Sequence, residues 1–135
     1  MKDVRKNYLG IDVSKQWFDV SLLVVLNHVK QPMLTDRFDN TITGMKVFKT
    51  WLKSKVVSYD ENSLLVIENT GVYHRLIWSF CSKYNLQLHI GNAAHIKWSL
   101  GITRGKNDVI DSQRLCLYCC KQQDELKLTP ALNPV

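Results

Sequence analysis

The sequence predicts one α/β domain built on a mixed β-sheet, and three observations lead to this fold class. The chain has 135 residues, of which 45% are hydrophobic, and this is enough for a folded domain with a buried core. Its first third contains successive segments rich in Val, Leu and aromatic residues, which is typical of strands. The rest alternates short apolar runs with segments whose apolar residues recur at helical spacing.

The N-terminal segments predict a meander of three strands. Residues 7–13 and 16–26 form the first two, and the short connection Ser14-Lys15 favours an antiparallel hairpin. A third strand is expected at about 32–39, after a turn at Asn27-His28.

The remaining segments predict β-α units. Residues 64–68 are apolar until the final Glu68, as expected for a central strand that is covered on both faces. The other expected elements are helices at 43–54, 72–84, 93–100 and 108–122, and a strand at 86–90.

Three meandering strands followed by β-α units predict a ribonuclease H-like fold, here a mixed five-stranded sheet with helices on its faces. An unrelated α/β sandwich is the alternative that the order of elements leaves open. We expect the domain to occupy residues 1–125. Residues 126–135 contain two prolines and no helical pattern, and they are expected to begin a linker to a further domain.

The charge of the chain indicates a polyanionic partner. The net charge is +6, from 18 basic and 12 acidic residues. Nucleic acid is the usual partner of such a surface, while charge that serves only solubility is the plain alternative. No apolar run reaches the ~20 residues of a membrane span, and no signal peptide is recognisable, so a cytoplasmic protein without a membrane partner is expected.

The cysteines favour burial rather than chemistry. Cys116 and Cys119 have the spacing of half a zinc site, but no second pair follows, and both fall in a predicted helix together with Cys120. We therefore expect small buried helix residues and no disulfides.

Four acids stand where acids are costly. Asp12 lies in an apolar strand, Glu68 ends another, and Asp108 and Asp111 open the last predicted helix. A buried charge costs several kcal/mol, as an order of magnitude, unless it is paired or bound to metal. In the predicted sheet the first strand and the strand at 64–68 are parallel neighbours, which brings Asp12 and Glu68 to adjacent strand ends.

Asp108 and Asp111 are three residues apart and would share one helical face, directed at the same edge of the sheet. An all-oxygen site of this kind suits Mg²⁺ or Mn²⁺, and we expect two ions. Each acid also has a plain alternative: a turn residue for Asp12, a helix cap for Glu68 or Asp108, and a helix-dipole acid for Asp111.

The segments around these acids resemble a known family. Gly10-Ile11-Asp12-Val13-Ser14-Lys15, then Glu68-Asn69-Thr70-Gly71-Val72-Tyr73, then Gly105-Lys106-Asn107-Asp108-Val109-Ile110-Asp111-Ser112 resemble the three signature blocks of DEDD transposases. These are the insertion-sequence recombinases of the family numbered one hundred and ten, which are related to pilin-gene invertases. The resemblance extends from about Tyr8 to Gln122.

This resemblance implies a RuvC-like catalytic domain in which Asp12, Glu68, Asp108 and Asp111 coordinate magnesium at the site of DNA cleavage. It also implies a C-terminal domain with a catalytic serine nucleophile, a homo-oligomer with composite active sites, and a structured guide RNA. The serines of this chain are not expected to be that nucleophile.

Basic and aromatic residues near the motifs are candidates for nucleic-acid contacts. Lys15, Arg104 and Lys106 flank the acids and are expected to contact phosphates, with solvated surface charge as the alternative. For Trp98 we favour core packing over nucleic-acid contact, and for His74 a surface or cap position.

The sequence thus predicts the N-terminal catalytic domain of a DNA transposase that cleaves and exchanges DNA strands with divalent metal ions. Two alternatives stay open: a stand-alone RuvC-like nuclease or Holliday-junction resolvase, and a non-catalytic nucleic-acid-binding module.

Overall fold

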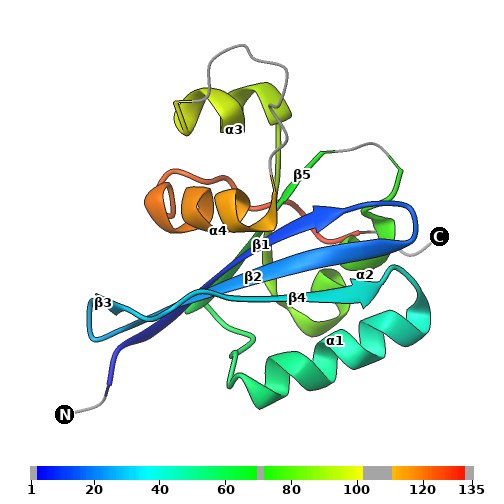
Figure 1. Ribbon diagram of the computed structural model, residues 1–135, viewed down its shortest axis with the longest axis horizontal. Coiled ribbons are helices and arrows are strands. Elements are labelled where there is room, and N and C mark those ends of the chain that lie inside the picture. The colour runs from blue at the N-terminus through cyan, green and yellow to red at the C-terminus, as the bar shows by residue number, and fades with distance from the viewer. Residues whose placement is uncertain (1–2, 70–71, 102–110, 133–135) are drawn as a thin grey trace.

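The computed structural model describes residues 3–69, 72–101 and 111–132. One mixed sheet runs through the molecule, with α1 and α2 on one side and α4, together with α3, on the other (Figure 1). The strands are β1 (Arg5–Val13), β2 (Trp17–Leu26), β3 (Val29–Lys30), β4 (Leu34–Asp39), β5 (Ser63–Glu68) and β6 (Gln87–Gly91). The helices are α1 (Ile42–Ser54), α2 (Arg75–Tyr84), α3 (Ala93–Ser99) and α4 (Ser112–Lys121).

The sheet has the order β3-β2-β1-β5-β6, and β4 pairs with the same edge of β2 as the two-residue β3. β1 and β2 form the predicted antiparallel hairpin, whereas β1, β5 and β6 run parallel to one another. The mixed sheet with helices on its faces confirms the predicted α/β, ribonuclease H-like fold. β3 is a short sixth strand in addition to the five that were predicted.

Alternate residues of β1 serve two separate cores, because side chains of a strand point to opposite faces. Leu9 and Ile11 belong to a large cluster under α1 and α2. This cluster contains a group of aromatic rings, in which the ring centroids of Phe18, Phe38 and Phe80 each lie 5.3 to 5.4 Å from that of Phe48. Tyr8 belongs to a smaller cluster with β5, α3 and α4.

α4 packs against β1 with its backbone, and Gly10 is the reason. A Cβ atom at Gly10 would lie 2.6 Å from the carbonyl carbon of Leu115 and closer still to backbone atoms of Ser112 and Cys116. The buried hydroxyls of Ser21 and Ser112 are hydrogen-bonded at 2.8 Å. Small residues on both elements therefore let the helix approach the sheet.

Two cysteines hold α4 to the sheet and are buried, as predicted. The thiol of Cys116 donates to the carbonyl oxygen of Tyr8 at 3.0 Å, and that of Cys119 donates to the carbonyl oxygen of Leu64 at 3.3 Å. Burial raises the pKa of Cys116 to about 12, which leaves this thiol protonated at neutral pH.

The segment after α4 packs on the domain as far as the structure describes it. Thr129 donates its backbone N–H to the carbonyl oxygen of Leu88 at 2.7 Å, and the indole of Trp78 donates to that of Pro130 at 2.9 Å. A domain boundary at residue 125 stays a prediction. In the described ranges, no helix is both long and apolar enough to cross a membrane.

Candidate functional site

Asp12 and Glu68 lie at neighbouring positions on adjacent parallel strands. Ile11 of β1 is in register with Ile67 of β5, so the next residues, Asp12 and Glu68, continue that pairing at the C-terminal ends of the strands. Neighbouring strands are ~4.8 Å apart, so the two carboxylates lie close together at the C-terminal ends of β1 and β5, a region called the acid edge below. Both side chains share the face of Gly10, on which α4 packs. The sequence prediction that these strands are parallel neighbours is confirmed.

The pKa values of Asp12 and Glu68 are both raised, as expected for partly buried acids that lie close to other acids. Burial raises the pKa of Asp12, and repulsion from Asp19 and Asp111 raises it further, while Arg37 acts in the opposite direction. Burial likewise raises the pKa of Glu68; Lys97 of α3 lowers it and Asp12 raises it. Asp111 thus repels the charge of Asp12, and Asp12 repels that of Glu68. Their mutual repulsion is the kind of cost that a bound cation removes.

Asp111 caps α4 rather than lying within it, which corrects the predicted helix start at residue 108. Its backbone is extended (φ −85°, ψ 174°), and its side-chain oxygen accepts the N–H of Arg114 at 2.9 Å. The helix begins at Ser112, where Gly10 allows it to touch β1. Asp108, the fourth predicted acid, lies outside the described residues, and so do Arg104 and Lys106.

Asp19 is an acid of the same edge that the sequence analysis missed. It is the cross-strand partner of Asp12, and Arg37 of β4 is in turn the partner of Asp19. Arg37 binds Asp19 with two hydrogen bonds, Nε–Oδ1 at 2.7 Å and Nη2–Oδ2 at 3.2 Å. The row across the sheet is therefore Arg37, Asp19, Asp12, Glu68. The tight hairpin at Ser14-Lys15 was the signal that could have paired Asp19 with Asp12.

The exposed residues of this edge include one predicted phosphate contact and an aromatic neighbour. Lys15 is exposed in the hairpin between β1 and β2. The guanidinium carbon of Arg37 lies 4.7 Å from the ring centroid of Trp17, which is 39% exposed. This is a cation–π arrangement, which fixes the position of the arginine.

One side-chain prediction was wrong and another was confirmed in one of its two alternatives. Trp98 is 83% exposed, whereas core packing had been favoured; α3 buries Ile96 instead. His74 was expected at a surface or cap position; it is the N-cap residue of α2, it is buried, and its side chain makes no capping hydrogen bond.

The residues at this edge suit a hard divalent cation. The side chains of Asp12, Glu68 and Asp111 offer only oxygen donors, and the first two are partly desolvated and repel each other. Within the described residues, however, no group of three or more His, Cys, Asp or Glu side chains is close enough to hold an ion together. The described part of the edge thus provides a pair of adjacent acids with a third nearby.

Comparison with known proteins bears on the same segments. The model of a DEDD-type family, described as a transposase, matches residues 9–133. This range includes β1 from Leu9 onward, the other strands, the helices and all four predicted acids. No curated protein matches the sequence.

Proposed function

Because the chain belongs to the DEDD transposase family, we propose that it is the metal-dependent catalytic domain with which such a transposase cleaves and exchanges DNA strands. The observation that carries the proposal is the register of β1 and β5, which brings Asp12 and Glu68 together beside the capping residue Asp111. The electrostatic coupling of Asp12 to both other acids supports it.

Asp12, Glu68, Asp108 and Asp111 would hold Mg²⁺ or Mn²⁺. When bound, such ions supply charge stabilisation for the attacking and leaving oxygens of a phosphodiester displacement. The protein's own contribution is position: two strand ends fix Asp12 and Glu68, and the N-terminus of α4 fixes Asp111.

Basic residues would orient DNA. Lys15, Arg104 and Lys106 are proposed phosphate contacts, and Arg37 is a fourth cation, held in place by Asp19 and Trp17. A C-terminal domain with the serine nucleophile, a homo-oligomer and a structured guide RNA belong to the same proposal. They rest on the family and not on the described residues.

Thermal melting with and without Mn²⁺ tests the metal site. At a free metal concentration of about 100 Kd, binding adds about 2.7 kcal/mol, a rise of several degrees for a domain of this size. Asp12→Asn and Glu68→Gln should abolish the rise. Glu61→Gln, an exposed acid before the opposite end of β5, should retain it.

Without metal, Asp12→Asn should melt no lower than the unchanged chain, because it removes a repelling charge from a partly buried position. A wild-type chain with no response to Mn²⁺ or Mg²⁺ would sink the proposal. Metal-dependent nicking of branched DNA by this chain alone would favour the junction-resolvase alternative.

A further inference from the structure

The positive charge of the chain is concentrated on the two helices that cover one side of the sheet. α1 with its C-cap Lys55 carries four lysines, and α2 carries Arg75 and Lys83, while neither helix contains an acid. These six charges equal the net charge of +6 of the whole chain. The rest of the chain, with twelve basic and twelve acidic residues, is balanced.

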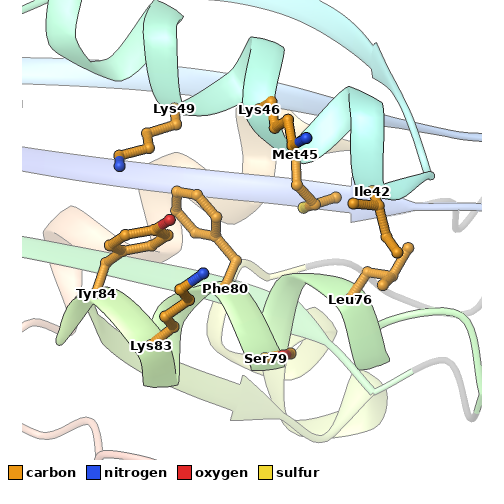
Figure 2. Close-up of a pocket in the computed structure, with 9 residues that line it drawn as sticks. All are labelled: Ile42, Met45, Lys46, Lys49, Leu76, Ser79, Phe80, Lys83 and Tyr84. Atoms are coloured by element: carbon orange, nitrogen blue, oxygen red, sulfur yellow. The ribbon is translucent and has the colours of Figure 1, made fainter.

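A groove of about 190 Å³ lies between these helices. Its apolar wall is made by residues of both helices, among them Met45, Leu76 and Phe80, and Lys46, Lys49 and Lys83 line it too. Figure 2 shows Lys49 of α1 and Lys83 of α2 extending toward Tyr84 from the two sides. Their ammonium nitrogens lie 4.2 and 5.4 Å from the centroid of the Tyr84 ring.

These lysines gather at one end of the groove without an acid to neutralise them on either helix. A hydrogen bond with Lys49 lowers the pKa of the Tyr84 phenol, and the positive charges of Lys49 and Lys83 lower it further. Lys46, Lys49 and Lys53 recur at three- and four-residue spacing along α1, so they lie on one stripe. That stripe is ~10 Å long at 1.5 Å per residue, the axial rise of about three phosphates of one DNA strand.

We infer that the α1–α2 groove binds the backbone of a duplex DNA segment, separate from the strand at the acid edge. Phosphates would contact Lys46, Lys49 and Lys83, and the apolar wall would contact deoxyribose. DNA is the polyanion that a transposase handles, and the match of the chain to a transposase family is the reason for choosing it over RNA. The inference rests on the proposed function, because that function supplies the DNA. It does not depend on the metal site, because α1 and α2 cover the side of the sheet opposite α4.

Anisotropy titrations of a labelled DNA duplex in chelator-containing buffer test this surface. The triple variant Lys46→Gln, Lys49→Gln, Lys83→Gln should weaken binding about tenfold or more and reduce the slope of log K against log salt by about 2 to 3, since each phosphate contact contributes about 0.9. The control triple Lys30→Gln, Lys121→Gln, Lys127→Gln removes the same charge from exposed positions outside α1 and α2. It should change affinity by less than about threefold.

Equal losses in the two triple variants would overturn the inference, because net charge alone would then explain binding. An RNA hairpin or an acidic peptide that competes better than the duplex, and only when the groove lysines are present, would overturn the choice of DNA. The melting response to Mn²⁺ should be the same in the groove triple variant and in the unchanged chain. Failure of the groove is therefore distinguishable from failure of the metal site.

Discussion

The two sides of the sheet are built on different principles. Under α1 and α2 the core contains large aromatic rings among its aliphatic residues, with Phe18, Phe38 and Phe48 in mutual contact and Phe80 against Phe48. Under α4 the contact is made by small residues, where Gly10 lets the helix backbone reach the strand. On the first side large side chains fill the space between helices and sheet, and on the second the helix backbone lies against the strand.

This difference corresponds to what each side has to position. The acids of the candidate site occur on β1, on β5 and at the first turn of α4, so the distance from helix to sheet sets their separation. Hydrogen bonds from Cys116 and between Ser21 and Ser112 add directional constraints on that side. The aromatic side contributes mainly buried apolar area, and its outer surface is free to carry charge.

The largest loss of stability is expected on the aromatic side. Phe48 is fully buried among other rings, and Phe48→Ala should lower the free energy of unfolding in urea by about 3–5 kcal/mol. The melting rise with Mn²⁺ should persist in the folded fraction, because no acid is displaced. Val47→Ala, at an exposed neighbouring position of α1, should cost less than about 0.5 kcal/mol. A loss of the metal response in Phe48→Ala would show that the two sides are not independent.

A smaller loss of stability, but a larger functional effect, is expected on the α4 side. Gly10→Ala adds a Cβ that meets backbone atoms of α4, and it should cost about 1–3 kcal/mol in urea unfolding. It should also abolish the Mn²⁺ response, because α4 and Asp111 must move. At Gly91 an added Cβ would lie 2.7 Å from Cδ1 of Ile96, a side chain that can rotate away, so Gly91→Ala should cost less. A Gly10→Ala protein with an intact metal response would refute the role assigned to close packing.

The sequence predicted the strands well because their apolar patterns reflect burial directly. The register of β1 and β5 then followed from the fold class, and with it the meeting of Asp12 and Glu68. A left-handed C-cap at Asn85 was predictable for a local reason, since asparagine tolerates this conformation; its φ is 57°.

The start of α4 was not predictable in the same way. Asp108 was expected as a cap and Asp111 as a helix-dipole acid, because an acid in either role stabilises the start of a helix. The contact of Gly10 with Ser112 is a long-range feature that accompanies the observed start. The prediction for Trp98 was wrong for a related reason. α3 has seven residues, of which Ile96 is the buried one, and so short an apolar pattern does not indicate which face of the helix is covered.

The smallest expected effect is a dependence of stability on pH, and it arises from a residue on the side of the sheet covered by α1 and α2. Burial lowers the pKa of His74, whose Nδ1 has no hydrogen-bond partner in the described structure. The unfolded chain therefore takes up a proton more readily than the folded one. Stability from this residue is fully present above the ordinary histidine pKa of about 6.5 and is lost as the pH falls below it.

The test is urea unfolding at pH 7.5 and at pH 5.5, conditions that lie on either side of about 6.5. The decrease in unfolding free energy between the two should be smaller in His74→Gln than in the unchanged chain, because the variant has no imidazole to protonate. His95→Gln, at an exposed position, controls for the loss of one histidine. Equal decreases in all three proteins would mean that His74 gains a proton as easily in the folded chain as in the unfolded one.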